Sequence, residues 1–172
     1  MMIKIGIFAF LTILLLAFTL GRRHRHRFYR FIVFESLLAL IFRNADSWFY
    51  DPVSPMHIVS WILLTASLLL AIHGFRLLHH AGSPNGDIED TTQLITTGAY
   101  QYIRHPLYCS LFLLGVGVFL KRPTLLDCSF LIILLISVYA TAKVEERDNI
   151  IKFGHAYRAY MEKTRMFIPF LF

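Results

Sequence analysis

The stretch "PLYCSLFLLGVGVFLKRPTLLDCSFLIILLISVYATA", residues 106–142, holds two apolar runs on either side of the short polar turn Lys121–Pro123. Proline favours the first turn of a helix, so Pro106 and Pro123 each mark a helix start. Each run approaches the roughly 20 apolar residues that a helix needs to cross a bilayer. The stretch therefore predicts an antiparallel hairpin of two membrane-spanning helices.

The rest of the chain continues this apolar pattern. Of its 172 residues 56% are hydrophobic, whereas soluble domains contain roughly 45–50% apolar residues. Further apolar runs cover residues 5–20, 28–42 and 58–72. We therefore expect an all-α, polytopic membrane helix bundle of about five transmembrane helices, folded as a single domain over residues 1–172. The last helix is expected to extend into the cytoplasm.

The basic block "RRHRHR", residues 22–27, sets the orientation. Lysine and arginine are enriched in cytoplasmic loops, and five spans that start outside put most of these residues on the cytoplasmic side. The alternating arginines would repel a metal ion, so we interpret the block as an anchor on anionic lipid. The sequence thus predicts an integral protein of the inner or plasma membrane, with its active site facing the cytoplasm. Neither a nucleic acid nor a metal is expected as a partner.

Two acidic residues lie within apolar runs, where ionisable side chains are functional candidates by default. Asp127 falls in the first turn after Pro123, where a favourable interaction with the helix dipole is a sufficient role. Glu35 lies in the run 28–42 and has no role that the sequence explains. Cys109 and Cys128 lie inside predicted spans without metal-ligand spacing and are interpreted as packing residues.

Polar residues converge at one end of the predicted hairpin. His105 lies 17 residues before Arg122 at the turn, and Glu145 lies 23 residues after it. At 1.5 Å per residue the two positions differ by only about 9 Å along the membrane normal. The polar loop 79–102 enters the same region. We therefore expect the half of the chain from 79 to 172 to bind a cofactor at the cytoplasmic interface.

The residue types at this end suit a zwitterionic ligand. The free amides at the start of the helix at Pro106, together with Arg104, can hold a carboxylate. Glu145 can take an ammonium group or ribose hydroxyls, and Tyr100 and Tyr108 can stack on a heteroaromatic ring. Taken singly, such residues are often simple membrane anchors. Their coincidence on one hairpin end favours a binding site.

At these residues the sequence resembles the integral membrane methyltransferases typified by isoprenylcysteine carboxyl methyltransferase, with phospholipid methyltransferases as relatives. The matching stretches are "TQLITTGAYQYIRHPLY" (92–108) and "EERDNIIKFGHAYRAYMEKTRMFIP" (145–169). The resemblance implies S-adenosylmethionine as the cofactor, enclosed in the helix bundle. It implies cofactor contacts by Thr92, Gln93, Leu94, Ile95, Tyr100, His105, Pro106, Leu107, Tyr108 and Glu145.

One position departs from the family pattern. The isoprenylcysteine enzymes carry a substrate-binding arginine four residues before the cofactor glutamate, and here that position is Thr141. Thr141 is therefore the candidate substrate-binding residue. We expect a lipophilic small molecule or lipidated substrate as the acceptor, whether a prenylcysteine carboxylate, a phospholipid amine or a thiol. As catalytic candidates, Arg104 could orient an anionic acceptor and Glu146 could receive a proton.

Two alternatives belong to other functional classes. One is a nicotinamide-dependent membrane reductase with a similar helical pocket, although about ten spans are expected of that class. The other is a non-catalytic membrane scaffold that keeps the pocket. Binding of NADPH would support the reductase, and methyl transfer would separate an enzyme from a scaffold.

Overall fold

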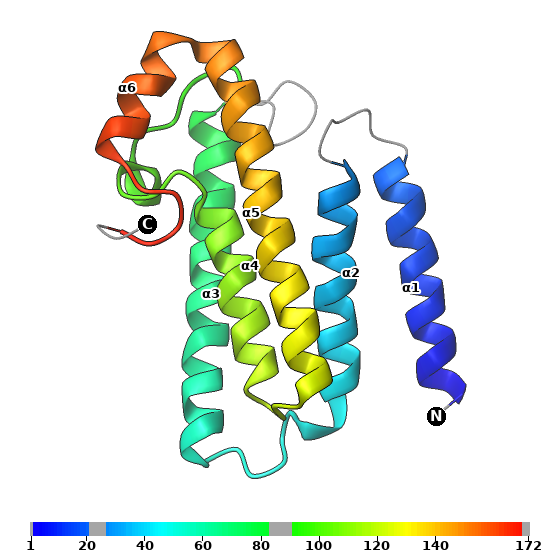
Figure 1. Ribbon diagram of the computed structural model, residues 1–172. Coiled ribbons are helices and arrows are strands. Elements are labelled where there is room, and N and C mark those ends of the chain that lie inside the picture. The colour runs from blue at the N-terminus through cyan, green and yellow to red at the C-terminus, as the bar shows by residue number, and fades with distance from the viewer. Residues whose placement is uncertain (1, 21–26, 83–90, 170–172) are drawn as a thin grey trace. The chain divides into compact units, whose positions relative to one another are not determined.

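The computed structural model describes residues 2–20, 27–82 and 91–169, and this part of the chain is helical without any β-strand. Six α-helices and two short 3-10 helices follow one another in it (Figure 1). Their bounds are α1 Met2–Leu20, α2 Arg27–Asn44, η1 Ala45–Ser47, α3 Pro55–Ala81, η2 Gly98–Gln101, α4 Pro106–Phe119, α5 Leu125–Phe153 and α6 His155–Lys163. The predicted all-α fold is confirmed.

Three of these helices, α1, α3 and α5, are long and apolar enough to cross a membrane. The apolar helix α4 has only 14 residues. Helix α2 has 18 residues but includes Arg30, Glu35 and Arg43, which lower its hydropathy. The expected membrane helix bundle is thus consistent with the structure, whereas crossing by α2 and α4 stays a prediction. Most of the basic block, residues 22–26, lies outside the described residues.

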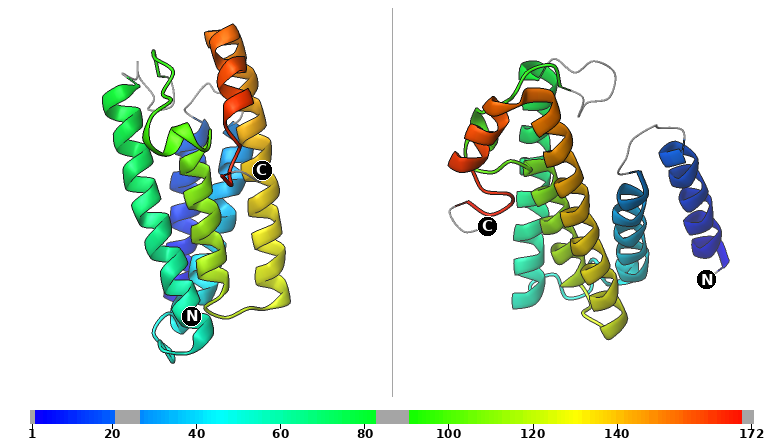
Figure 2. Two further views of the ribbon diagram at one scale, coloured as in Figure 1. Left: turned by 90° about the vertical axis from the view of Figure 1, so that its left-hand side faces the viewer. Right: turned by 45° about the horizontal axis from the view of Figure 1, so that its top comes forward.

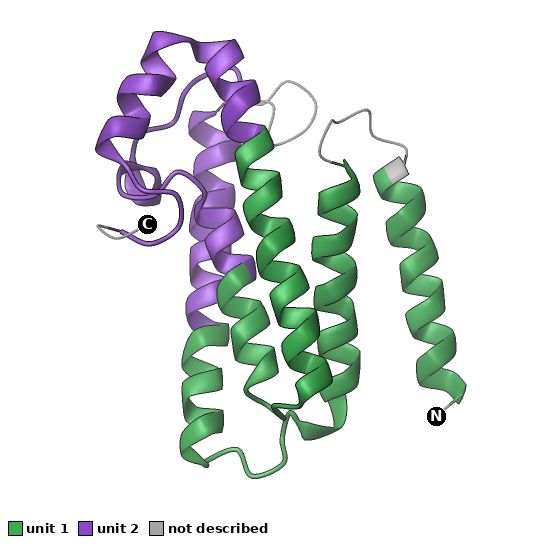
Figure 3. Cartoon of the chain, viewed as in Figure 1, with its two compact units in different colours: residues 1–64, 112–144 green, residues 65–111, 145–172 purple. Residues whose placement is uncertain are grey.

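The chain forms two compact units, and α3, α4 and α5 each pass from one unit into the other (Figure 3). Unit 1 comprises Met1–Leu64 and Phe112–Val144, and unit 2 comprises Thr65–Leu111 and Glu145–Phe172. Unit 2 therefore holds η2, the start of α4, the end of α5 and α6. Of the candidate site residues, only Thr141 belongs to unit 1.

Close helix contacts hold unit 1 together. The Ser60 hydroxyl on α3 donates a hydrogen bond to the Gly117 carbonyl on α4 at 2.6 Å. A Cβ atom built on Gly115 would lie 2.3 Å from Cδ2 of Leu134 on α5. Small residues let helices approach closely in membranes, where packing rather than the hydrophobic effect drives association. The two glycines thus explain how α4 lies against its neighbours.

The two acids in the apolar runs both have partners in unit 1. The Thr124 hydroxyl accepts from the Asp127 backbone N–H at 3.2 Å, which caps the start of α5, and it donates to Asp127 Oδ2 at 2.5 Å. Arg43 Nε donates to Asp127 Oδ1 at 2.5 Å. The Asp127 carboxylate therefore bonds to the capping residue Thr124 and pairs with Arg43 on α2. Glu35 accepts a hydrogen bond of 2.9 Å from the Thr12 hydroxyl, which joins α1 to α2.

In unit 2 the chain turns sharply between α5 and α6 (Figure 2). Gly154 lies at the turn with a φ of +58°, a conformation that costs glycine little and other residues more. Helix α6 then runs back from the end of α5 and buries Tyr157 and Tyr160. The expected extension of the last helix is therefore a continuation of α5 to Phe153 followed by a separate helix.

Candidate functional site

The segment that leads into α4 is held by the C-terminal part of the chain. The backbone N–H groups of Arg104 and His105 donate to the carbonyls of Arg165 and Met166 at 2.8 and 3.2 Å. The Arg165 N–H in turn donates to the Tyr102 carbonyl at 3.1 Å. Both amides just before Pro106 are therefore used inside the protein. These two amides lie before α4, so their bonds do not test the expectation that the amides of its first turn hold a ligand carboxylate, which stays a prediction.

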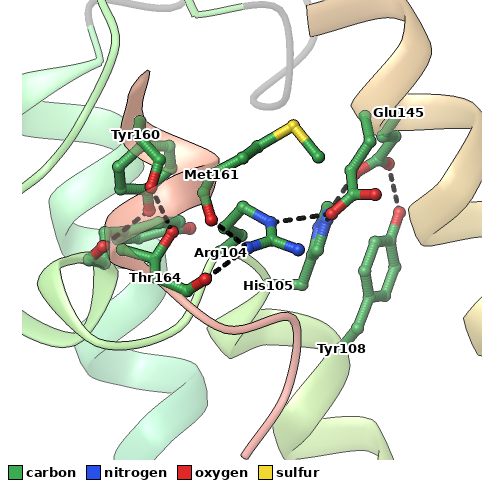
Figure 4. A network of polar contacts seen from close by, with 9 residues as sticks. Arg104, His105, Tyr108, Glu145, Tyr160, Met161 and Thr164 are labelled. Atoms are coloured by element: carbon green, nitrogen blue, oxygen red, sulfur yellow. Dashed lines mark hydrogen bonds and ion pairs between the residues drawn. The ribbon is translucent and has the colours of Figure 1, made fainter. Parts of the chain in front are cut away.

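Arg104 lies at the centre of a buried polar network (Figure 4). Its Nε donates to Glu146 Oε1 at 2.7 Å, and the two side chains are only 9% and 4% exposed. Its Nη1 donates to the Thr164 carbonyl at 2.6 Å and to the Met161 carbonyl at 3.3 Å. The guanidinium thus ties α5 to the end of α6 and the residues that follow it. In this arrangement the predicted catalytic pair, Arg104 and Glu146, bond to each other.

His105 stands between two carboxylates. Its Nδ1 lies 3.7 Å from Glu145 Oε2, and its Nε2 lies 3.7 Å from Glu146 Oε1. The Tyr108 hydroxyl hydrogen-bonds Glu145 Oε1, and the Tyr108 ring lies 5.6 Å from the imidazole, centroid to centroid. The predicted proximity of His105 and Glu145 is therefore confirmed. The ring, the phenol and the carboxylate form one polar surface.

A pocket in unit 2 opens beside this surface. Seven of the ten residues predicted to contact a cofactor line it, namely Leu94, Ile95, Tyr100, His105, Leu107, Tyr108 and Glu145. Thr92, Gln93 and Pro106 do not. The first two donate their backbone N–H groups to the Gly82 carbonyl and are exposed, whereas Pro106 is buried in packing.

Six residues that line the pocket were not singled out as cofactor contacts or as a catalytic pair. They are Leu78, Thr91, Asn149, Phe153, Tyr157 and Tyr160. The signal for two of them was present, because Asn149 and Phe153 follow Glu145 at intervals of four and so share its face of α5. Tyr157 and Tyr160 reach the pocket only because the chain turns at Gly154, which helical spacing alone does not predict.

Burial changes the acidity of the two tyrosines from α6. It raises the pKa of Tyr157 to about 12, although a hydrogen bond with Asn149 opposes the shift. It also raises the pKa of Tyr160, whose hydroxyl donates to the Tyr100 carbonyl at 2.6 Å. Both hydroxyls therefore stay protonated at neutral pH. The site offers neutral phenols together with the carboxyl groups of Glu145 and Glu146.

Other candidates have different surroundings. The Thr141 hydroxyl donates to the Ser137 carbonyl in the preceding turn of α5 at 2.8 Å, and the side chain is fully buried in unit 1. Cys109 and Cys128 are free thiols. In the described ranges no three His, Cys, Asp or Glu side chains come together as a metal site would require.

Comparisons with known proteins place the chain among membrane methyltransferases. Residues 55–154 match the family model for phospholipid methyltransferases. A methanethiol S-methyltransferase of Crocosphaera subtropica is 35% identical over 78 residues. That match covers 44% of this chain and 29% of the relative, so the chain spans less than a third of that protein's length in the match.

Proposed function

This chain belongs to the phospholipid methyltransferase family, and from that premise we propose that it transfers a methyl group from S-adenosylmethionine to a lipophilic acceptor. The pocket of unit 2 is the proposed site. We further propose that this site faces the cytoplasm of a cell with the chain in its inner or plasma membrane, since the basic residues follow the positive-inside rule.

The observation that carries the proposal is the group of His105, Tyr108 and Glu145 at the pocket wall. The chemistry of these donors and acceptors fits the cofactor. The Glu145 carboxylate can accept from ribose hydroxyls or an ammonium group, and His105 offers a polar ring atom beside it. The aromatic rings of Tyr100 and Tyr108 provide flat surfaces for a purine. When bound, S-adenosylmethionine supplies an electrophilic methyl group on a sulfonium.

The size of the pocket implies that it adapts. Its free volume is about 100 Å³, whereas pockets for drug-sized ligands usually measure roughly 300–1,000 Å³. We therefore expect side chains to move apart when the cofactor binds. The Tyr108–Glu145 hydrogen bond is the first candidate to break, because both groups can form hydrogen bonds with a ligand instead of with each other.

We propose a thiol as the acceptor. A carboxylate acceptor needs a cation, but Thr141 stands where the isoprenylcysteine enzymes have arginine. Arg104, the one arginine or lysine among the described pocket residues, already bonds to Glu146 and two carbonyls. A thiol needs no such cation, and the relative from Crocosphaera subtropica acts by name on methanethiol. A phospholipid amine is the second candidate, since the matched family model carries that description.

The protein's contribution to such a reaction is mainly positional. The acceptor must be held in line with the methyl group, with water excluded from the nucleophile. Leu78, Leu94, Ile95, Leu107 and Phe153 supply the apolar part of the wall. In this proposal Arg104 and Glu146 hold His105 in place, and neither acts on the acceptor.

The test uses the purified full chain in lipid nanodiscs. Calorimetric titration with S-adenosylhomocysteine is expected to give saturable binding. Labelled S-adenosylmethionine is then offered with an alkane thiol, phosphatidylethanolamine or a prenylcysteine, and label is expected in the thiol. Binding of NADPH without S-adenosylhomocysteine would replace the proposal with a reductase. If the chain binds S-adenosylhomocysteine but transfers no methyl group to any of the three acceptors or to any component of a membrane extract, the protein is a non-catalytic scaffold.

A further inference from the structure

Unit 1 holds a groove between three helices that the proposed function does not use. Its lining residues are Lys4, Ile5 and Phe8 of α1, Ala39, Phe42 and Arg43 of α2, and Phe130 of α5. All of them belong to unit 1, and none of them lines the pocket of unit 2. The free volume of the groove is about 300 Å³, which is where the size range of ligand pockets begins. The groove is therefore large enough to take part of a ligand.

The wall of the groove is apolar apart from Lys4 and Arg43. The rings of Phe8 and Phe42 stand edge to face with their centroids 5.6 Å apart. Helix α1 runs alongside α2 (Figure 1), and no residue in its apolar stretch Met2–Thr19 is buried inside the protein. An apolar space holds no ordered water. In a bilayer the occupant of the groove is therefore a hydrocarbon chain.

Two cations mark one end of the groove. Lys4 is the first lining residue on α1, and Arg43 is the last on α2. The Lys4 ammonium hydrogen-bonds to the Asp46 carboxylate, and these two side chains are 50% and 83% exposed. Arg43 Nε donates to the buried Asp127, while the Arg43 side chain is 32% exposed. An ammonium group has three N–H donors and a guanidinium five, so each of these bonds leaves donors for a further anion.

The charges at this end match the head group of one class of lipid. A phosphate is an anion that suits two neighbouring cations, because lysine and arginine both bind phosphate oxygens. The Asp46 carboxylate is open to solvent and keeps lone pairs beyond its bond with Lys4. It can therefore accept from an ammonium group. A phosphate and a primary ammonium joined to hydrocarbon chains make an aminophospholipid such as phosphatidylethanolamine.

We propose that the groove of unit 1 binds one aminophospholipid. Its acyl chain lies against the rings of Phe8 and Phe42. Its phosphate contacts Lys4 and Arg43, and its ammonium group contacts Asp46. The bound lipid adds contacts between α1 and α2. This inference does not depend on the proposed function, because no groove residue takes part in it.

Titration of the full chain in detergent, followed by native mass spectrometry, tests the inference. The probes are phosphatidylethanolamine, phosphatidylcholine and phosphatidylglycerol with the same acyl chains. The wild type should bind one molecule of phosphatidylethanolamine roughly 3- to 5-fold more tightly than either other lipid, which is the range of an exposed ion pair. The reason is that choline has no N–H group to donate and that the glycerol head group has no cation.

Three variants separate the parts of the site. Asp46→Asn should bring the preference for phosphatidylethanolamine over phosphatidylglycerol to one or below, because the acid is lost and both cations remain. Lys4→Gln should weaken the binding of both lipids. Ala39→Leu should weaken the binding of all three, because the larger side chain takes up space in the groove. Asp51→Asn is the matched control, since Asp51 is exposed and does not line the groove, and it should bind like the wild type.

Equal binding of the three lipids by the wild type would overturn the inference, and so would tighter binding of phosphatidylglycerol than of phosphatidylethanolamine. An unchanged preference in Asp46→Asn would overturn it too, because the lipid would then bind elsewhere on the chain. Should Ala39→Leu not fold, Asp46→Asn decides, since the Asp46 side chain is exposed. Binding of S-adenosylhomocysteine is measured separately, so the proposed function can fail or stand on its own.

Discussion

Arg104 Nε and Glu146 Oε1 lie 2.7 Å apart in a network that is almost closed to solvent. The same guanidinium also holds the carbonyls of Met161 and Thr164. A buried arginine with three acceptors fixes the relative positions of three chain segments, namely the start of α4, the end of α5 and the turn after α6. His105 follows this arginine directly in the sequence, so the bonds of Arg104 also fix the position of His105.

Replacing Arg104 with alanine is expected to lower the free energy of unfolding by about 3–5 kcal/mol, because Glu146 is left as a buried charge without its partner. Thermal unfolding in detergent micelles would measure the loss. Glu146→Gln should be milder, since a neutral amide can still accept from the guanidinium. An Arg104→Ala variant with wild-type stability but no activity would contradict this and return Arg104 to a direct role toward the acceptor.

Tyr108 and Glu145 should act as a coupled pair in cofactor binding. Glu145→Gln is expected to weaken binding of S-adenosylhomocysteine by roughly 10- to 100-fold, the usual cost of losing a hydrogen bond to a charged group. Tyr108→Phe should cost less, and the double variant less than the sum of both. Calorimetric titration of the wild type, the two single variants and the double variant gives the coupling free energy between Tyr108 and Glu145. Glu162→Gln, an exposed acid on α6, is the control that should bind like the wild type.

The raised pKa of Tyr157 predicts a loss of stability in alkali. Below pH 10 the phenol is protonated in both the folded and the unfolded chain, so its contribution to stability is complete. Between about pH 10 and pH 12 the unfolded chain loses this proton while the folded chain keeps it. The free energy of unfolding should therefore fall as the pH rises, by up to about 3 kcal/mol.

Chemical unfolding across this pH range tests that prediction. Tyr157→Phe should flatten part of the decline, and Tyr160 should account for a further part because its pKa is raised in the same direction. Tyr50→Phe is the matched control, since Tyr50 is 79% exposed and its removal should leave the pH profile as it was. Identical profiles for Tyr157→Phe and the wild type would refute the assignment.

Gly115 permits the close approach of α4 and α5 in unit 1. A Cβ there would meet Leu134 at 2.3 Å, so Gly115→Ala is expected to destabilise the protein by about 1–3 kcal/mol through overpacking. Gly6→Ala on α1 is the comparison, because nothing lies within 4 Å of its Cβ position. The unfolding temperature of Gly115→Ala should therefore be clearly lower than that of Gly6→Ala. Equal shifts would mean that the Leu134 side chain moves aside without loss of stability, which would contradict the prediction.

Local chemistry in the sequence was enough to predict several features. The apolar runs imply helices because a backbone in lipid must satisfy its own hydrogen bonds, and Pro106 marks the start of α4 as expected. Counting along the hairpin brought His105 and Glu145 together, and they lie 3.7 Å apart. That count succeeds because the rise of a helix is constant.

Tertiary structure decided what no local rule contains. Arg104 and Glu146 looked available for catalysis as single residues, but their bond to each other and to the C-terminal segment depends on contacts between positions 42 to 60 residues apart. Tyr157 and Tyr160 enter the pocket because the chain reverses at Gly154. The sequence by itself determined the helices and the types of side chain at one end of them. Only the fold decided which of those side chains bond within the protein and which can bind a ligand. The reason is that hydrogen-bond partners distant in sequence compete for the same groups.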